Sequence, residues 1–461
     1  MNPVIINQLE KIVSPSGILT TIEDRAVYSY DSTFLEGMPQ VVVLPQSTGQ
    51  VAEIVKIAAR ERIPIITRGM GSGLAGGSVP VQGGIVLCTT RMDRILEFDQ
   101  KNATILVQSG VVTADLQNHV AKSGFYYPPD PSSVRHSTIG GNIACNAGGP
   151  HCLKYGVTGD YVLGLTAVMA DGEILKTGTK VIKDVAGYDL KSLLTGSEGT
   201  LAIITEALLK VIAGRKFVET ALVEFSSLDD AGQAVYEILH AGLLPSTIEL
   251  MDQTALECIE KAMKIGLPTG VAAVLIIETD GVDQEATRRE MESVASVCRQ
   301  FSGANITIAI DDTQREHLWK ARRSVSPSLG RLAPNKLGED ISVPRDTIPE
   351  AVRRIRQISA KNGLPIVIYG HAGDGNLHPN ILFDKRDPVQ MATVDQMVAE
   401  IFEVALDLGG SITGEHGVGI LKKPFLHKAL GDVSINLQKR IKNAFDPLNI
   451  LNPGKIFSDD I

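Results

Sequence analysis

Two short histidine-containing segments carry the residue types best suited to chemistry. The first, GHAGDGNLH, covers 370–378 and places His371 and His378 seven positions apart, and the second, GEHG, covers 414–417. Along one straight strand, residues an odd number apart face opposite ways. An Asp-Gly turn lies between the two histidines, so we expect the chain to reverse there and the imidazoles to converge.

Glu415 from the second segment would add a carboxylate to these histidines. Two histidines and one carboxylate with open positions form a ligand set for a divalent metal such as Zn, Mn or Fe. A histidine at a strand end is more often a hydrogen-bonding cap than a ligand. Two histidines flanking a glycine turn, with a Glu-His pair in a glycine-rich loop, are harder to explain by packing. We therefore predict His371, His378 and Glu415 as metal ligands.

A glycine-rich loop, RGMGSGLAGG, covers 68–77 and follows a predicted strand. Its GxGxxG spacing would suit a nicotinamide-binding Rossmann domain, in which a helix follows and holds the pyrophosphate at its N-terminus. The next residues, GSVPVQGG (77–84), cannot form that helix, so we exclude this fold. Successive backbone N–H groups without a helix still make an anion nest, although a tight turn at a sheet edge would fit the glycines equally well.

A second cluster, PPDPSSVRHSTIGGNIACNAGGPHCLKYG (128–156), combines prolines, hydroxyls, amides and glycines. Such residues suit a backbone that runs close against a large polar ligand. Together with Arg68 at the entrance of the first loop, this cluster favours a phosphate-containing ligand over a simple turn.

These two clusters, with GSEGTLAIITE (196–206), resemble the FAD domain of the vanillyl-alcohol-oxidase-like, PCMH-type flavoproteins. From about residue 20 to residue 457 the chain resembles their branch of D-lactate dehydrogenases, glycolate oxidase D-subunits and D-2-hydroxyglutarate dehydrogenases. The resemblance implies an α+β protein in three parts. These are a PCMH-type FAD-binding domain of two α+β subdomains (1–213), an α/β, ferredoxin-like substrate-binding cap domain with the metal site (214–420), and a C-terminal helical segment returning to the flavin (421–461).

The resemblance also implies where FAD binds. The 68–74 loop wraps the pyrophosphate, the second cluster lines the flavin, one residue lies near the adenine and one approaches the isoalloxazine. In that order the implied residues are Arg68, Gly69, Gly71, Ser72, Gly73, Leu74; Pro129, Asp130, Thr138, Gly141, Asn142, Asn146, Gly148; Ile203; and Asn452. Many relatives tether FAD through a histidine in the first loop. This loop has none, and we expect non-covalent FAD rather than a tether to His151 or Cys152.

The implied reaction is the oxidation of a small D-2-hydroxy acid, glycolate or D-lactate, to the 2-oxo acid by metal-assisted hydride transfer to the flavin. A neutral imidazole suits proton abstraction near pH 7, and His416 is the candidate base. The substrate carboxylate needs a cation, preferably a planar fork. LWKARRSVS (318–326) offers Arg322 and Arg323. The family's WxxR pattern selects the first of these, and the resemblance adds Ser326, Lys336 and Asn376 at the substrate.

Three rival functions fit parts of the sequence. An oxidase that passes electrons to oxygen would carry the same residues. A non-catalytic or weakly active flavoprotein subunit of a larger glycolate/lactate oxidase electron-transfer complex predicts a degraded substrate site, which the intact histidines, glutamate and arginine argue against. An ether-lipid synthase of the same superfamily needs a lipid tunnel and fits the hydroxy-acid motifs less well.

The elements expected to position these residues alternate along the chain. In the first half, strands are predicted at 41–44, 63–67, 84–90, 94–99, 103–110 and 201–212, a hairpin at 162–175 turning at Asp171-Gly172, and helices at 51–58 and 113–122. In the second half, strands are predicted at 217–225, 271–281, 305–311 and 365–371, and helices at 228–242, 283–301, 346–362 and 388–408. This alternation predicts a second sheet with helices packed on one face.

Composition excludes several other classes. The net charge is −9 and no basic stripe occurs, which argues against nucleic-acid binding. The five cysteines show no iron–sulfur spacing and suggest a reducing compartment. The N-terminus does not read as a signal peptide, and no stretch approaches the ~20 apolar residues of a membrane span. We expect a cytoplasmic protein, attached to membranes at most through partners. Its electrons would leave to an iron–sulfur subunit, an electron-transfer flavoprotein or a cytochrome, and a homodimer is compatible with the sequence.

Overall fold

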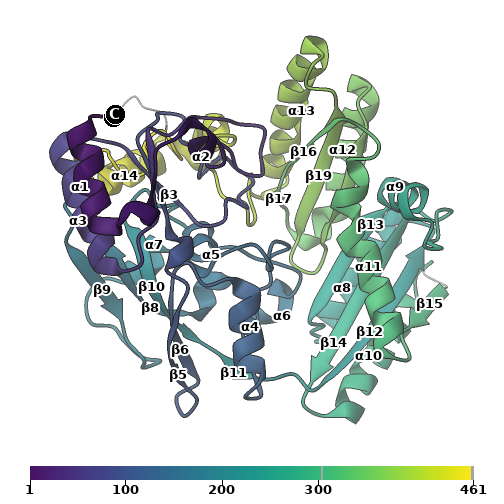
Figure 1. Ribbon diagram of the computed structural model, residues 1–461. Coiled ribbons are helices and arrows are strands. Elements are labelled where there is room, and N and C mark those ends of the chain that lie inside the picture. The colour runs from purple at the N-terminus through teal and green to yellow at the C-terminus, as the bar shows by residue number, and fades with distance from the viewer. Residues whose placement is uncertain (303–304, 458–461) are drawn as a thin grey trace. The chain divides into compact units, whose positions relative to one another are not determined.

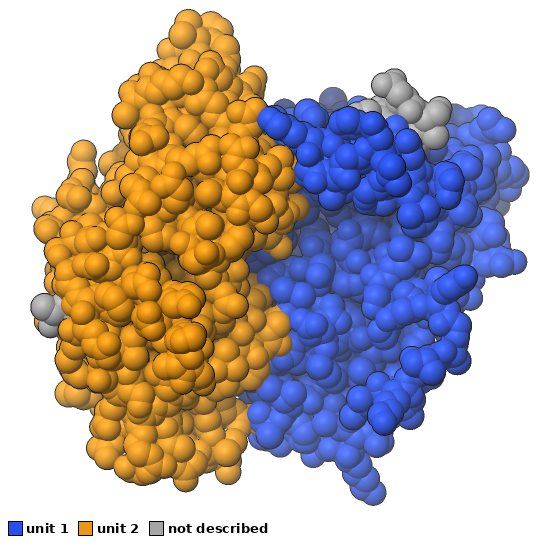
Figure 2. All heavy atoms as spheres, turned by 180° about the vertical axis from the view of Figure 1, so that it is seen from behind, with its two compact units in different colours: residues 1–148, 157–213, 415–461 blue, residues 149–156, 214–414 orange. Residues whose placement is uncertain are grey.

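The computed structural model describes residues 1–302 and 305–457, and the chain divides into two compact units. Unit 1 comprises 1–148, 157–213 and 415–461, and unit 2 comprises 149–156 and 214–414 (Figure 2). One division follows Ala213, where the sequence suggested a domain boundary. The next lies between Gly414 and Glu415 rather than after residue 420, and the short stretch 149–156 belongs to unit 2 although both of its flanks belong to unit 1.

The first sheet of unit 1 carries the glycine-rich loop at one strand end. Its order is β1-β2-β4-β3, with β1 (Ile18–Leu19), β2 (Val41–Val43), β3 (Ile65–Arg68) and β4 (Ile85–Cys88). The last three are parallel and largely buried because they consist mostly of β-branched and other apolar residues. Helices α1 (Pro3–Val13) and α3 (Thr48–Glu61) share their apolar core, and Ser47 caps α3 by accepting from the N–H of Gln50. No helix lies between residues 69 and 84, as predicted from the loop sequence.

The second sheet of unit 1 is antiparallel and has the order β5-β6-β10-β8-β9 (Figure 1). Its strands are β5 (Ile95–Asp99), β6 (Thr104–Gln108), β8 (Val162–Val168), β9 (Ile174–Gly178) and β10 (Ile203–Lys210). The predicted hairpin is confirmed: β8 pairs with β9, and Gly172 has the positive φ of 88° that the turn requires. The core of this sheet also takes side chains from α4 (Thr113–Ala121), α5 (Ile139–Cys145), α7 (Leu190–Leu194) and the C-terminal α14 (Leu426–Phe445). Unit 1 also contains α2 (Ile22–Ala26) and the strand pair β7 (Phe125–Tyr126) and β11 (Ile212–Ala213).

Unit 2 is built on one large antiparallel sheet with the order β15-β12-β14-β13-β18-β19-β16, and β17 pairs with β19. The strands are β12 (Phe217–Phe225), β13 (Thr247–Asp252), β14 (Ala273–Gly281), β15 (Asn305–Ile308), β16 (Asn335–Gly338), β17 (Ile341–Ser342), β18 (Ile366–His371) and β19 (Asn376–Phe383). The helices are α8 (Leu228–His240), α9 (Gln253–Met263), α10 (Gln284–Cys298), α11 (Asp312–Leu329), α12 (Ile348–Asn362) and α13 (Pro388–Asp407), with the short α6 (Cys152–Tyr155) in the 149–156 stretch.

The prediction that helices pack on one face of this sheet is wrong. Helices α9 and α11 share an apolar core with Met251, Ile276 and Val367 on one face. Helices α8, α10 and α12 lie against the strands on the other, where neighbouring residues such as Leu250 and Ile277 are also buried. The sequence did not reveal β13 or α9, so the second helical layer was not anticipated.

None of the five cysteines forms a disulfide. Within residues 1–302 and 305–457, no helix is both long enough and apolar enough to cross a bilayer. The α+β class expected from the sequence is confirmed by this combination of mostly antiparallel sheets and covering helices.

Candidate functional site

The two histidines of the first motif converge in unit 2. β18 ends at His371 and β19 begins at Asn376, and Gly375, with φ 85°, closes the turn by donating its N–H to the carbonyl of His371. Asn376 pairs with His371, and Tyr369 pairs with His378, so the two imidazoles lie diagonally on one face. Their ring centroids are 5.1 Å apart at 87°, and one nitrogen of each ring lies within 4.8 Å of the other. The predicted convergence is confirmed, and this spacing would allow both rings to bind one ion.

Each histidine faces a buried carboxylate that was not predicted. Nδ1 of His371 donates to Oε1 of Glu249 at 2.5 Å, and Nδ1 of His378 lies 3.9 Å from Oδ1 of Asp340. An ionised carboxylate only accepts hydrogen bonds, so Glu249 fixes the proton of His371 on Nδ1 and leaves Nε2 as the lone-pair nitrogen. Such carboxylate–histidine pairs commonly orient metal-binding imidazoles.

Arg322 lies on α11 and shares this site. Its Nε donates to Oε2 of Glu249 at 2.5 Å, and its guanidinium carbon lies 4.7 Å from the centroid of the Tyr369 ring. Burial alone would raise the pKa of Glu249, but Arg322 and His371 outweigh it and lower that pKa to about 2. The neighbouring Arg323 points away, since 53% of its side chain is exposed and it pairs with Glu316. The structure therefore separates the two arginines of the LWKARRSVS segment.

Lys336 and Ser326 are bonded to each other. The Lys336 ammonium donates to the hydroxyl and, at 3.1 Å, to the carbonyl of Ser326, and burial lowers the pKa of Lys336. Lys336 lies on β16 opposite Leu382 of β19, four residues from His378 along that strand and therefore on the same face. These two residues are thus brought to the same sheet face as the histidines.

Asn376 and Gly414 are both held by Asp340, whose carboxylate is fully buried. Oδ1 accepts from Nδ2 of Asn376 at 2.6 Å, and Oδ2 accepts from the hydroxyl of Thr413 and the N–H of Gly414. The second Nδ2 hydrogen of Asn376 goes to the carbonyl of Ile341. These two bonds fix the orientation of the Asn376 amide, because both acceptors require a donor. Its Oδ1 is then the atom that can accept a hydrogen bond from a ligand.

Glu415 and His416 belong to unit 1, directly after the anchored Gly414. On their other side, Glu198 accepts from the N–H groups of Val418 and Gly419 at 2.7 and 2.8 Å. The Glu-His pair therefore sits in a short loop fixed in unit 2 before it and in unit 1 after it. Burial raises the pKa of Glu198.

The glycine-rich loop follows β3 in unit 1. Arg68, its first residue, donates to the carbonyl of Tyr30 and packs so close to Gly71 that a Cβ there would lie 2.0 Å from the guanidinium. Among residues 1–302 and 305–457, no protein acceptor is found for the backbone N–H groups of Gly71 to Leu74. A run of amides without partners fits the phosphate-binding role expected of the loop.

The second glycine-rich cluster supports this loop. Thr138 caps α5 by accepting from the N–H of Gly141, and a Cβ on Gly69 would lie 2.3 Å from its Oγ1. Pro129 accepts from Gln117 through its carbonyl, while Asp130 and Gly148 lie in adjoining loops of unit 1. The side-chain amide of Asn142 is already bonded to Thr113, and Asn146 ends α5 with φ 51° and accepts from Gly159. The latter two side chains therefore organise the loop, and its backbone remains to meet a ligand.

Two further predicted cofactor residues differ in what they can offer. The side chain of Ile203 is fully buried in the core of the first sheet, so only its backbone can approach a ligand. Asn452, with φ 45°, donates through Nδ2 to the carbonyls of Gly77 and Glu198, and its buried Oδ1 has no hydrogen-bond partner among residues 1–302 and 305–457. A buried amide oxygen without a donor fits a bound cofactor that supplies one.

Sequence reasoning missed Glu249, Asp340 and Glu198. Each is a buried carboxylate set in an apolar or glycine-rich stretch, as in TIELMD (247–252), DISV (340–343) and GSEGT (196–200). A single acidic residue within such a stretch is the signal that could have found them, because a buried carboxylate requires partners.

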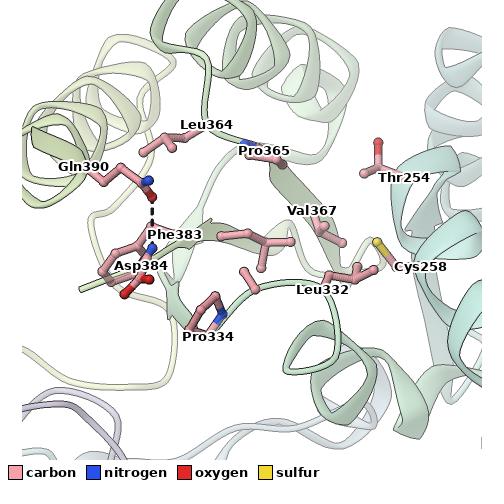
Figure 3. A pocket seen from close by; sticks show the side chains of 12 residues that line it. Thr254, Cys258, Leu332, Pro334, Leu364, Pro365, Val367, Phe383, Asp384 and Gln390 are labelled. Atoms are coloured by element: carbon pink, nitrogen blue, oxygen red, sulfur yellow. Dashed lines mark hydrogen bonds between the residues drawn. The ribbon is translucent and has the colours of Figure 1, made fainter. Parts of the chain in front are cut away.

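An apolar pocket of about 420 Å³ lies elsewhere in unit 2 (Figure 3). Val367 and Leu382 line it, at the ends of β18 and β19 that lie away from the histidines. Its few polar groups include Thr254, Cys258 and Gln390, and Gln390 is bonded to the backbone N–H of Asp384. Burial raises the pKa of Cys258 to about 11, so this thiol stays protonated, and the carboxylate of Asp384, which also lines the pocket, is paired with Arg386.

Solved structures share this fold. p-Cresol methylhydroxylase superposes with a TM-score of 0.84 over 99% of this chain and 96% of that protein, at 18% identity. 4-Ethylphenol oxidase from Gulosibacter chungangensis gives a TM-score of 0.79 over 99% and 97%, at 20% identity. At these identities the likeness concerns the fold alone, and it confirms the expected PCMH-type architecture.

Sequence relatives cover nearly the whole chain. It is 46% identical to glycolate oxidase subunit GlcD of Bacillus subtilis, over 98% of this chain and 96% of that protein. It is 33% identical to a D-lactate dehydrogenase of Anaerostipes hadrus (99% and 98%) and 32% identical to a D-2-hydroxyglutarate dehydrogenase of Stutzerimonas stutzeri (99% and 99%). Residues 39–178 match the FAD binding domain family, and residues 215–456 match the C-terminal domain of FAD linked oxidases. The chain therefore belongs to the FAD-linked oxidases and is an FAD-dependent oxidoreductase.

Proposed function

We propose that this protein is a dehydrogenase that oxidises a small D-2-hydroxy acid, with glycolate and D-lactate as first candidates, to the 2-oxo acid. The observation that carries the proposal is the link that Glu249 makes between His371 and Arg322 on one sheet face. A 2-hydroxy acid presents a carboxylate and a hydroxyl on adjacent carbons. An arginine and a metal held by histidines are suited to bind these two groups. The names of the relatives support the same substrate class.

Arg322 binds the substrate carboxylate in this proposal. Its Nε is engaged by Glu249, and within the described residues neither Nη donates to a protein acceptor, so the Nη edge is available for a paired interaction. Lys336, held by Ser326, adds a second cation on the same face, and Asn376 accepts a hydrogen bond through Oδ1.

His371, His378 and Glu415 would hold a divalent metal, Zn, Mn or Fe. The hydrogen bond from His371 to Glu249 supports this role, and the carboxylate of Asp340 lies 3.9 Å from His378. When bound, such a metal would lower the pKa of the substrate hydroxyl and orient its carbon. His416 follows Glu415 directly and accepts the hydroxyl proton on a ring nitrogen.

Non-covalent FAD, when bound, would supply the hydride acceptor for this oxidation. The amides of Gly71 to Leu74 would hold its phosphates, the backbone of residues 129–148 would line the flavin, and the buried Oδ1 of Asn452 would be available as an acceptor. Electrons then pass to an external protein acceptor, in keeping with relatives that are named as subunits. We propose a cytoplasmic location for this activity.

A dye-reduction assay with purified protein tests the proposal. Glycolate, the D- and L-forms of lactate and the D- and L-forms of 2-hydroxyglutarate are compared under anaerobic conditions. We expect reduction with glycolate or a D-acid and slow reoxidation of the reduced protein by air. Exclusive use of L-acids would contradict the assigned stereochemistry, and rapid reoxidation by oxygen would make the protein an oxidase.

His416→Ala tests the catalytic assignment. Loss of a general base typically lowers turnover by ~10²- to 10⁴-fold. The FAD absorbance should stay at the wild-type level, because no part of the proposed FAD site includes His416. Wild-type turnover in this variant would show that the proton goes elsewhere.

A further inference from the structure

Glu249 occupies a position that is costly for an acidic side chain. It lies within β13 of the unit 2 sheet, directly opposite His371 of β18, and its residue exposure is 0%. Moving an ionised carboxylate out of water costs several kcal/mol unless partners compensate it. The partners of Glu249 therefore need to be strong and well oriented.

Its two oxygens are divided between two elements of the fold. Oε1 accepts from Nδ1 of His371, and Oε2 accepts from Nε of Arg322, each at 2.5 Å. Thr247, two residues earlier on the same strand face, adds a weaker bond of 3.4 Å to Oε1. One buried carboxylate thus joins a β18 imidazole to an α11 guanidinium.

The two bonds to Glu249 determine which atoms of His371 and Arg322 remain available to a metal or a substrate. With Nδ1 protonated toward Glu249, the lone pair of His371 lies on Nε2, the other side of the ring. With Nε bound to Glu249 and the guanidinium packed on Tyr369, Arg322 presents its Nη edge in one orientation. Both groups are therefore set relative to the same carboxylate.

We infer that Glu249 is a positioning residue that fixes the separation between the metal ligand His371 and the carboxylate-binding Arg322. This inference rests on the proposed function. The hydroxyl and carboxylate of a 2-hydroxy acid stand on adjacent carbons, so their two binding groups must keep a fixed spacing. Glu249 sets that spacing from the protein side without touching the substrate.

Glu249→Gln tests this role while keeping the side chain's shape. An amide has one acceptor oxygen, and its NH₂ end cannot accept from Arg322 or His371, so one of the two bonds is lost. Misorienting a metal-bound histidine typically weakens metal affinity 10- to 100-fold. We expect this loss in titrations of the chelator-treated, FAD-containing protein with Mn²⁺ or Zn²⁺ alone, together with a raised KM for the hydroxy acid.

Asp252→Asn is the matched control. Asp252 is a fully buried carboxylate on the same strand, bonded to the N–H of Ala255 and to Arg356 rather than to site residues. We expect wild-type metal affinity and KM in this variant. Glu249→Asp keeps the charge but shortens the reach, so it should bind metal with intermediate affinity. This variant also provides the measurement if the glutamine variant does not fold.

The outcomes separate the inference from the function on which it rests. If wild type binds metal and oxidises a hydroxy acid, and the Glu249 variants match it in metal affinity and KM, the positioning role is wrong while the function stands. If wild type binds neither Mn²⁺ nor Zn²⁺, the metal-assisted function and the positioning role both fall. If Asp252→Asn loses as much metal affinity as Glu249→Gln, general destabilisation explains the loss in both variants, and the inference is overturned.

Discussion

The side-chain amide of Asn452 donates to the backbone carbonyl of Glu198, 254 positions earlier in the chain, at 2.8 Å. A second bond joins it to the carbonyl of Gly77, at the end of the glycine-rich loop. One side chain near the C-terminus therefore connects two of the three segments proposed to surround FAD, and Glu198 in turn holds the backbone just after His416.

Asn452→Asp should weaken FAD retention. The change removes both donated bonds and sets a carboxylate against the carbonyls of Gly77 and Glu198, and an unsatisfied buried group costs about 1–3 kcal/mol. We expect roughly 10-fold weaker FAD binding, measured as the flavin-to-protein absorbance ratio after gel filtration. Asn449→Asp is the control, because Asn449 lies on the same segment with a similar φ of 49° but is exposed. Equal FAD loss in both variants would refute a specific role for Asn452.

Arg322→Lys should lower kcat/KM for the hydroxy acid by roughly 10- to 100-fold, because an ammonium cannot reproduce a charge-assisted fork. The measurement is steady-state dye reduction. Arg323→Lys alters the adjacent, exposed arginine and should leave kcat/KM near the wild-type value. If the two variants behave alike, the substrate carboxylate is bound by another cation.

Removal of the metal should abolish turnover without releasing FAD, because the proposed ligands and the proposed FAD site share no residue. We expect at least a 10-fold loss of dye reduction after dialysis against a chelator, an unchanged flavin spectrum, and recovery with Mn²⁺ or Zn²⁺. His378→Ala should prevent that recovery. Full activity in protein shown to be metal-free would contradict a metal-assisted reaction.

Asp252 should make stability fall as pH rises through the mildly acidic range. Burial raises the pKa of Asp252 to about 6 from its ordinary 3.8, despite the Ala255 N–H and Arg356 beside it. A raised folded-state pKa contributes stability that is complete below pH 3.8 and lost as pH rises through 6. The difference amounts to roughly 3 kcal/mol. Chemical denaturation of Asp252→Asn between pH 4 and 7 should show a flatter profile than wild type, and parallel profiles would contradict the pKa shift.

Local patterns in the sequence predicted much of the fold. The segment FVETALVEF (217–225) and the Asp171-Gly172 turn gave the right strands because local propensity and tertiary packing agree there. β13 went unseen because TIELMD (247–252) places Glu249 and Asp252 among its apolar residues, which hides a strand buried on both faces. With β13 missing, the helical layer of α9 and α11 could not be inferred.

In the candidate site, too, the features that depend on neighbouring residues could be predicted, and those that depend on distant residues could not. The turn between His371 and His378 could be predicted because Asp-Gly is a local signal. The carboxylates behind the site could not, since Glu249 is 122 positions from His371, and Asp340 is 36 positions from Asn376. Contacts over such separations depend on strand order, which local patterns do not specify.

The stretch 149–156 bears on how the chain can be cut or built. His151 and Lys154 bind Glu278 and Asp280 of the unit 2 sheet, so the chain passes between the units after residues 148, 156, 213 and 414. Neither unit is one continuous piece of sequence. During translation, the first 213 residues cannot complete their core, because Ile450 and Leu451 belong to it and Leu451 pairs with Ile65. Expression of residues 1–213 alone should therefore yield an incomplete fold. The core of the FAD-binding unit can form completely only after Ile450 and Leu451 have been synthesised.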